Sequence, residues 1–188
     1  MAEDATARLR VLFVCTGNMH RSPLAERLLA PRLPGAQVTS AGTQAPNGQG
    51  MHPATLSVLT ELGGDGSGFV TRPLTARLVA DASLVLGMER EHRESAARLC
   101  PTALRRCFTV KEFVRLAHRN RPDAPPREVI AAAAAARGSH GPVRAADDTF
   151  PDPWGEDYDM LQRQALEIDR CVAEVADLLR GRSRIPAG

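Results

Sequence analysis

The 188-residue chain predicts an α/β domain in which helices cover both faces of a four-stranded parallel sheet. Short apolar, β-branched runs alternate along the chain with segments of helical periodicity, and this alternation is typical of parallel sheets. The hydrophobic fraction of 43% and the charged fraction of 24% lie near globular averages, so the chain can bury a sizeable core. We therefore expect residues 1–188 to form a single domain.

The first predicted strand spans residues 9–14 and leads directly into a helix. Ser22 has the side chain of an N-cap and Pro23 suits the first helical turn, so we expect the helix to begin there. Pro31 and Pro34 then interrupt its apolar stripe. The later elements alternate, with strands expected at 36–42, 82–88 and 104–110 and helices at 54–63, 89–99 and 111–118.

Two C-terminal segments contrast with each other. Residues 119–146 mix prolines and glycines with a run of six alanines at 131–136, which predicts a short helix inside a mobile insertion. Alanine favours helix but buries little area, so we expect this helix to pack weakly. The last helix has instead a continuous apolar face, formed by Leu161, Ala165, Ile168, Val172, Val175 and Leu179.

Composition excludes several classes of protein. A net charge of +2 gives no reason to expect a nucleic-acid partner, and no apolar run reaches the roughly 18 residues of a membrane span. Acidic residues near the N-terminus argue against a signal peptide. The four cysteines are too scattered for a disulfide scaffold, so we expect free thiols in the cytoplasm. Histidines and cysteines show no metal-ligand spacing, so no metal is predicted.

The segment CTGNMHRSP, from Cys15 to Pro23, carries the chemistry. A cysteine at the end of a parallel strand and Arg21 at the mouth of a helix surround one concavity with a thiol, backbone N–H groups and a guanidinium. Such a concavity suits a phosphate, and its field favours the thiolate form of Cys15. The planar fork of Arg21 holds two phosphoryl oxygens. Gly17 is expected to adopt backbone angles that a β-carbon would resist.

This loop resembles the active-site loop of the low-molecular-weight protein tyrosine phosphatases, in which Cys-x5-Arg-Ser-Pro follows the first strand. Ser40-Ala41-Gly42-Thr43 and Asp152-Pro153 match the same family. The resemblance covers residues 9–118 and 147–180. It implies a flavodoxin-like fold with the phosphate-binding loop after strand one, and it makes the segment 119–146 an insertion atypical of the family.

The resemblance also implies an activity. Phosphotyrosine in proteins, and aryl phosphates, would be hydrolysed in two steps through a cysteinyl-phosphate intermediate, without a metal or other cofactor. Cys15 would attack phosphorus, Arg21 would clamp the phosphoryl oxygens, and Asp152 would protonate the leaving group and then activate water. Ser22 would donate to the Cys15 sulfur and Asn18 would hold the loop in shape. The phosphate site implied by the loop comprises Thr16, Gly17, Asn18, Met19, His20 and Ser22.

Several acids compete for the role of proton donor. Asp147, Asp148 and Asp152 lie within six residues, and Asp152 is preferred because Asp152-Pro153 matches the family's motif and proline restricts its geometry. Asp148 stays open as a partner or substitute. We expect the loop 152–158 to fold over the phosphate site, with Trp154 and Tyr158 stacking on the aryl group. The alternative for Trp154 is a place in the core.

Two positions, His20 and Gln44, depart from the family's pattern, and a third, Met19, bears on the substrate. His20 stands where a second cysteine is common. If protonated, it would help to stabilise the Cys15 thiolate, and otherwise it packs away from the site. Bulky Met19 resembles the tyrosine-directed members, whereas a threonine there is typical of the arginine phosphatases. Gln44 stands where an apolar or aromatic wall is often found, which leaves aryl stacking to the acidic loop.

Three other functions stay open on the same fold. Arsenate reduction would use Cys100 and Cys107 as a redox pair, although their predicted places favour buried structural thiols; Cys171 is expected in the core. Protein arginine phosphatase activity and a catalytically silent phosphate-binding module are the others. The arginine- and alanine-rich composition is typical of GC-rich, actinobacterial-type genomes, and a bacterial tyrosine autokinase is therefore a candidate partner by analogy. The sequence does not specify an oligomeric state.

Overall fold

The computed structural model describes residues 9–119, 124–138, 148–153, 155 and 157–180. Its centre is a parallel sheet of four strands in the order β2-β1-β3-β4. The strands are β1 (Arg10–Cys15), β2 (Gln37–Gly42), β3 (Leu84–Gly87) and β4 (Cys107–Thr109). The predicted four-stranded parallel sheet is confirmed, and the described part of the chain contains no helix able to cross a bilayer.

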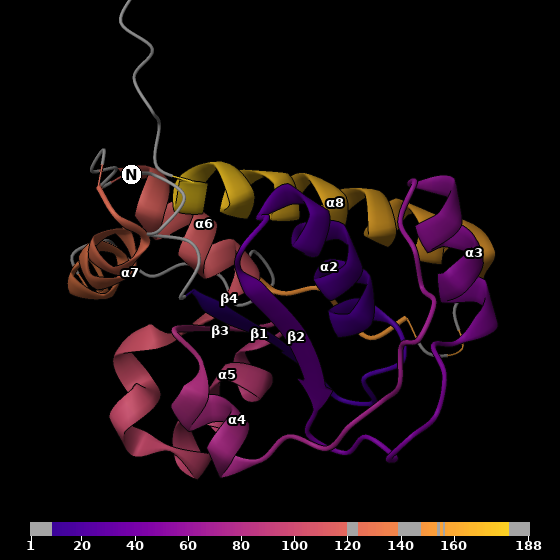
Figure 1. Cartoon of the computed structure of the whole chain (residues 1–188), viewed down its shortest axis with the longest axis horizontal. Coiled ribbons are helices and arrows are strands. Elements are labelled where there is room, and N and C mark those ends of the chain that lie inside the picture. The colour runs from indigo at the N-terminus through magenta and orange to yellow at the C-terminus, as the bar shows by residue number, and fades with distance from the viewer. Residues whose placement is uncertain (1–8, 120–123, 139–147, 154, 156, 181–188) are drawn as a thin grey trace, which may run out of the picture.

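Helices cover both faces of the sheet (Figure 1). One face carries α2 (Arg21–Leu29), α6 (Val110–Arg119) and α8 (Tyr158–Arg180), and the other carries α4 (Ala76–Asp81) and α5 (Arg90–Leu99). The helices α3 (Pro53–Glu61) and α7 (Pro126–Ala135) lie beside α8 near its two ends. Short 3₁₀ turns occupy Ala30–Arg32 and Pro101–Arg106.

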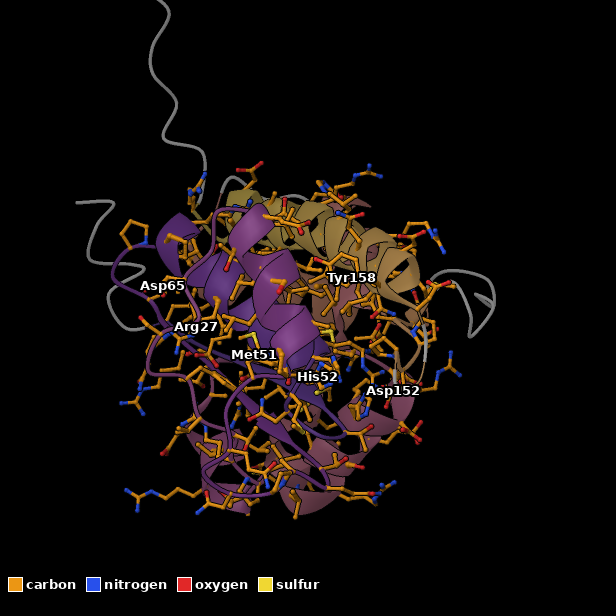
Figure 2. All side chains as sticks on the ribbon, turned by 90° about the vertical axis from the view of Figure 1, so that its right-hand side faces the viewer. Arg27, Met51, His52, Asp65, Asp152 and Tyr158 are labelled. Atoms are coloured by element: carbon orange, nitrogen blue, oxygen red, sulfur yellow. The ribbon has the colours of Figure 1, made fainter. Side chains whose placement is uncertain are left out.

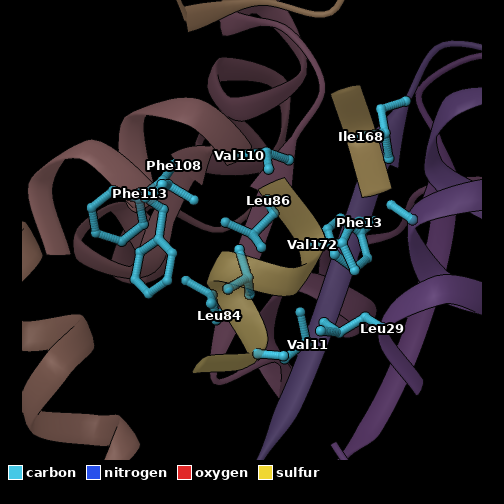
Figure 3. Close-up of a cluster of buried hydrophobic side chains, with 14 of the residues drawn as sticks. Val11, Phe13, Leu29, Leu84, Leu86, Phe108, Val110, Phe113, Ile168 and Val172 are labelled. Atoms are coloured by element: carbon cyan, nitrogen blue, oxygen red, sulfur yellow. The ribbon is translucent and has the colours of Figure 1, made fainter. Parts of the chain in front are cut away.

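Side chains of the strands alternate between two buried clusters. Val11, Phe13 and Cys15 join the larger cluster with α2, α6 and α8, whereas Leu12 and Val14 join the smaller one beneath α4 and α5. Figure 3 shows the larger cluster, to which the apolar face of α8 contributes as predicted. Because both faces of the sheet are buried at its centre, β1 and β3 appear in the sequence as continuous apolar runs.

The helix after β1 begins one residue earlier than Ser22, so the predicted cap is wrong. His20 occupies the N-cap position and its side chain makes no capping bond. Ser22 lies inside the first turn and is fully buried. Its hydroxyl bonds with groups of the preceding loop, so the residue that looked like a helix signal serves the loop.

The fourth strand is shorter than the predicted 104–110. Residues Pro101–Arg106 form a 3₁₀ turn with Pro101 at its start, and only Cys107–Thr109 pair with β3. Leu104, which looked like part of the strand, is more than half exposed. The sequence also gave no expectation of α4, where the Thr75 side chain accepts a bond from the backbone of Leu78.

The alanine-rich helix is longer and better packed than predicted. α7 begins at Pro126, five residues before the alanine run, and buries Val129, Ile130 and Ala133 in the larger cluster. The apolar residues that anchor it therefore precede the alanines. Just after α7, the Arg137 guanidinium lies 4.0 Å above the Phe108 ring. That residues 119–146 are an insertion stays a prediction.

Candidate active site

The site lies at the carboxyl edge of the sheet, where ligands bind in open α/β folds. β1 ends there at Cys15, and the following loop leads into α2 at Arg21. Beside the loop is a cavity of about 410 Å³, which the Asp152 carboxylate borders from the C-terminal part of the chain. The lining residues are Cys15, Thr16, Gly17, Met19, His20, Arg21, Gln44, Pro46 and Asp152.

The Cys15 thiol is held by two polar neighbours although it is only 2% exposed. The backbone N–H of Asn18 donates to Sγ at 3.2 Å, and the Ser22 hydroxyl lies 2.9 Å from Sγ. The Ser22 oxygen already accepts a bond from the Asn18 side chain at 3.0 Å, which directs its own proton to sulfur. Two hydrogen-bond donors are thus aimed at one sulfur, where they would stabilise negative charge during a reaction.

Asn18 gives the loop its shape. Its φ of 52° makes it the one non-glycine residue with positive φ in the described ranges, and asparagine tolerates that conformation well. Its buried amide donates to Ser22 and to Ser40 (2.8 Å) and accepts from the backbone N–H of Arg72 (3.0 Å). Gly17 does not have a positive φ, so the expectation that it takes the special backbone angle is wrong.

Gly42 and Glu26 support the loop from outside, and neither was predicted to do so. A β-carbon at Gly42 would lie 2.4 Å from the Thr16 carbonyl oxygen, so only glycine lets β2 end this close to the loop. The Ser40 hydroxyl donates to the Glu26 carboxylate at 2.6 Å. Burial raises the pKa of Glu26. The hydrogen bonds thus run from Glu26 through Ser40 to the amide of Asn18.

Arg21 is 2% exposed, and its guanidinium is fixed on several sides. Nη1 donates to the Phe150 carbonyl oxygen at 2.8 Å and pairs with Glu89. Nη2 lies 2.9 Å from the Asp152 carboxylate and 3.5 Å from the Thr16 hydroxyl. Neither Glu89 nor Phe150 was predicted, since a backbone carbonyl and a glutamate 68 residues away leave no local sequence signal.

The structure separates the acids that competed for the role of proton donor. Asp152 reaches the cavity with 46% of its side chain exposed. Asp148 is buried and pairs with Arg115 at 2.9 Å, which commits it to α6. Asp157 accepts the backbone N–H of Met160 at 2.7 Å in the first turn of α8. Asp147 lies outside the described residues.

His20 packs, and it carries no charge near neutral pH. Nδ1 lies 2.7 Å from the Thr55 hydroxyl, and the ring lies 4.5 Å from that of His52 between centroids. Burial, with a smaller contribution from the charge of His52, lowers the pKa of His20 to about 4. A neutral ring does not stabilise the Cys15 thiolate by charge, and because His20 still lines the cavity it does not point away from the site either.

Tyr158 does not line the cavity of Cys15. Its hydroxyl donates to the Glu61 carboxylate at 2.7 Å, which turns the ring toward α3. There it borders a neighbouring cavity of about 400 Å³ that shares His20 with the first. Figure 2 shows Tyr158, His52 and Asp152 on the same face of the molecule. The expected stacking of Tyr158 on an aryl group is therefore not supported, and Trp154 lies outside the described residues.

The other cysteines lie away from the site. Through Val85, Cys107 is in register with Leu12, three residues before Cys15, which places it about 10 Å back along the strands and two strands across. It also belongs to the opposite buried cluster. Burial raises the pKa of Cys107 and of Cys171 to about 11. Cys100 and Cys171 are half-buried, not fully buried as expected.

One group of possible metal ligands occurs among the described residues, and the protein itself uses its donors. Atoms of Glu89, Glu91 and His92 lie within 4.8 Å of one another. Glu89 pairs with Arg21, and the two ring nitrogens of His92 bond with the Glu89 backbone and the Thr16 hydroxyl, each at 3.0 Å. These contacts favour a structural role for the group.

Comparison with known proteins agrees with this geometry. Residues 10–126 match the family model "Low molecular weight phosphotyrosine protein phosphatase". Among curated relatives, the low molecular weight protein-tyrosine-phosphatase Etp of Escherichia coli K12 is 40% identical over 94 residues, 48% of this chain and 62% of Etp. Wzb of the same organism is 40% identical over 91 residues, with the same coverage. The chain thus spans less than two thirds of the length of these relatives.

Solved structures extend the similarity over most of the chain. The YwlE arginine phosphatase from Geobacillus stearothermophilus is 28% identical with a TM-score of 0.68, over 90% of this chain and 91% of that one. The low molecular weight protein tyrosine phosphatase from T. tengcongensis is 28% identical with a TM-score of 0.67, over 88% and 96%. Because the family model matches more than half of the residues, the chain belongs to the low molecular weight phosphotyrosine protein phosphatase family.

Proposed function

We propose that the protein hydrolyses phosphotyrosine in proteins, and aryl phosphates, through a cysteinyl-phosphate intermediate. One observation carries the proposal: the Cys15 thiol, the Arg21 guanidinium and the Asp152 carboxylate border a single cavity. A nucleophile, a bidentate anion ligand and a proton donor are what two-step phosphoryl transfer to water requires. The mechanism uses protein groups alone.

In the first step, Arg21 and the backbone N–H groups of the loop bind the phosphoryl oxygens. The Cys15 thiolate attacks phosphorus while the bond from phosphorus to the tyrosine oxygen breaks. Asp152, protonated at this stage, gives its proton to the departing phenolate. Its place 2.9 Å from Arg21 Nη2 supports this role, because the carboxyl group is then next to the bound phosphoryl group.

In the second step, Asp152 acts as a base. Its carboxylate removes a proton from water, the water oxygen attacks the phosphocysteine, and the bond between phosphorus and sulfur breaks. The Ser22 hydroxyl, 2.9 Å from Sγ, donates to the sulfur as negative charge returns to it. Asn18 acts on the sulfur in two ways: its backbone N–H donates to Sγ directly, and its side-chain amide holds Ser22 in place.

The cavity wall and the relatives support the proposed substrate class. Met19 and Pro46 offer apolar surface beside Cys15, as a phenyl ring requires. The relatives Etp and Wzb are named protein-tyrosine-phosphatases. We extend the proposal to phosphorylated proteins as substrates, with a bacterial tyrosine autokinase as one partner by analogy. We also propose a cytoplasmic location, because free thiols such as the four cysteines persist in reducing compartments.

We further propose that residues 1–188 act as one domain, with 119–146 as an insertion in it. The anchoring of α7 supports this, since Val129 and Ile130 belong to the same buried cluster as Phe13 of β1. The insertion would then be integrated with the core of the catalytic domain.

The test is steady-state hydrolysis of a phosphotyrosine peptide across pH 4 to 9. We expect wild type to turn over, Cys15→Ser to lose activity by at least about 10⁴-fold, and Asp152→Ala to lose about 10²- to 10⁴-fold. Asp159→Ala, an exposed acid on α8, is the matched control. If phosphoarginine is hydrolysed faster than phosphotyrosine, the function is that of the structural neighbour YwlE. Binding of phosphate without turnover of either substrate contradicts both.

A further inference from the structure

We propose that Glu89 and His92 form a clamp that orients two anion-binding side chains of the cavity, Arg21 and Thr16. The clamp lies at the N-terminus of α5, on the loop that follows β3. It deepens the proposed function and rests on it in one respect, since Thr16 and Arg21 are taken to bind the phosphoryl group. Glu89 and His92 themselves are positioning residues, because neither lines the cavity.

The tautomer of His92 is set by the backbone. The N–H of Glu89 donates to Nδ1 at 3.0 Å, so Nδ1 carries no proton and the neutral ring carries it on Nε2. Nε2 lies 3.0 Å from the Thr16 hydroxyl oxygen and 3.6 Å from the Glu91 carboxylate. The shorter contact is within hydrogen-bond distance and the longer one is not. Nε2–H therefore donates to Thr16.

Accepting this bond fixes where the Thr16 proton points. A hydroxyl group has one proton and two lone pairs. The Thr16 oxygen accepts from His92 and, more weakly, from Arg21 Nη2 at 3.5 Å. Both lone pairs are then occupied, and the proton is left to donate toward an anion in the cavity that Thr16 lines with Cys15. A donor oriented before the substrate arrives needs no reorganisation during the reaction.

Glu89 acts on Arg21 in the same way. Its carboxylate pairs with Nη1 and also accepts the backbone N–H of His92, in a reciprocal capping box. The turn that places it is tight, since a β-carbon at Gly87 would lie 2.9 Å from the Glu89 carbonyl oxygen. The first turn of α5 thus holds Arg21 through one residue and Thr16 through the other.

Burial protects the arrangement. His92 is 1% exposed, and desolvation together with the Arg21 charge lowers its pKa to about 4. The ring stays neutral near pH 7, so the tautomer that donates to Thr16 is the one present under those conditions.

The experiment measures the affinity for inorganic phosphate by calorimetry together with kcat/KM for a phosphotyrosine peptide. Asparagine at position 92 keeps an acceptor near Nδ1 for the Glu89 N–H but has no donor at the place of Nε2, whereas glutamine restores a donor there. We expect His92→Asn and Thr16→Val each to weaken both quantities about 10-fold. His92→Gln should recover part of the loss. The double variant should lose no more affinity or activity than the more impaired of the two single variants, because each single substitution already removes the same hydrogen bond.

Glu91→Gln is the matched control, since Glu91 is the other group near Nε2, and it should change both quantities less than twofold. If His92→Asn and His92→Gln have equal urea midpoints at pH 7, a difference between them in affinity or kcat/KM reflects the positioning of Thr16 and not the stability of the fold. The clamp is contradicted if the losses of His92→Asn and Thr16→Val multiply in the double variant, or if Glu91→Gln has the larger effect. If wild type binds phosphate without hydrolysing phosphotyrosine, the proposed function fails while the phosphate affinities still decide the clamp. Absence of phosphate binding by wild type overturns both.

Discussion

Two buried cysteines in the same sheet have opposite surroundings. Cys15 ends β1 and meets two hydrogen-bond donors, from Ser22 and Asn18. Cys107 begins β4 among apolar side chains, and burial raises its pKa to about 11. The two thiols are 2% and 0% exposed. Burial alone therefore does not decide whether a thiol reacts, and the groups that point at the sulfur do.

The topology explains the difference. The carboxyl end of a parallel strand opens into a loop and a helix N-terminus, which supply N–H groups that side chains do not cover. The amino end of β4 follows a 3₁₀ turn that packs against α4 and α5, and among the residues that the structure describes no hydrogen bond to the sulfur of Cys107 is found. Opposite ends of one sheet thus provide one polar and one apolar site for the same side chain.

The largest expected difference between Cys15 and Cys107 is in their rates of alkylation. Iodoacetamide at pH 7 should modify Cys15 at least about 100-fold faster than Cys107, because only thiolate reacts and only Cys15 has donors that stabilise it. Peptide mass spectrometry over time measures both rates. Saturating phosphate should protect Cys15, and Cys107→Ser should keep kcat/KM within about twofold. Equal labelling of both residues in the folded protein would break the comparison.

The next effect concerns the residue that shapes the loop. Asn18→Ala removes a buried amide with three partners and forces alanine to positive φ. We expect a loss of about 2–4 kcal/mol in the free energy of unfolding and of about 100-fold in kcat/KM. Urea denaturation and steady-state kinetics measure these changes. Asn47→Ala, at an exposed position, is the control and should leave both unchanged.

A smaller effect should appear in the pH dependence of stability. The pKa values of His20 and His92 are lowered from 6.5 to about 4. Between these pH values the unfolded chain binds more protons than the folded chain, so stability should fall as pH drops from about 6.5 to 4. The slope is at most about 1.4 kcal/mol per pH unit for each histidine, and less for the more exposed His20.

Urea midpoints at pH 7, 6 and 5 measure this slope, and His92→Asn should flatten it. The raised pKa of Glu26 acts in the opposite direction at the acidic end, since a carboxyl that protonates more readily when folded gains stability there. Stability that is constant or rises between pH 6.5 and 5 would contradict the assignment of two neutral histidines with lowered pKa values.

The smallest expected effect is at Tyr158. Tyr158→Phe removes the exposed bond to Glu61 and should change kcat/KM for the phosphotyrosine peptide less than about twofold, because the ring borders the neighbouring cavity. Tyr158→Ala should likewise leave the KM for this peptide nearly unchanged. A KM that rises severalfold for the alanine variant alone would restore the stacking role that the sequence suggested.

The sequence was sufficient for the sheet and for the residues of the loop itself. Buried parallel strands leave continuous apolar runs, and Cys15, Arg21 and Ser22 lie within eight consecutive residues. The sequence was insufficient where one residue type is compatible with two structural roles. Ser22 resembles a helix cap but bonds to sulfur. Asn18 was expected to hold the loop in shape, but the special backbone angle was expected at Gly17, whereas Asn18 has the positive φ.

Contacts between distant segments had no local signal. Glu89, His92 and the Phe150 carbonyl reach the site from segments 68 to 129 residues away from Arg21 or Thr16. Similarly, the packing of α7 depends on Val129 and Ile130, whereas the conspicuous alanine run beside them supplies little buried area. These features require the fold, because only the topology brings the segments together.

The arginine that follows α7 has a consequence for solubility. β4 is an edge strand of only three residues, and edge strands offer unpaired backbone groups to other chains. The Arg137 guanidinium donates to the carbonyl oxygen of Cys107, the first residue of that strand, and to that of Leu104, which precedes the strand. It also lies over the ring of Phe108. Removing α7 together with Arg137 would therefore uncover an edge prone to pairing between molecules, and aggregation would be its first visible symptom.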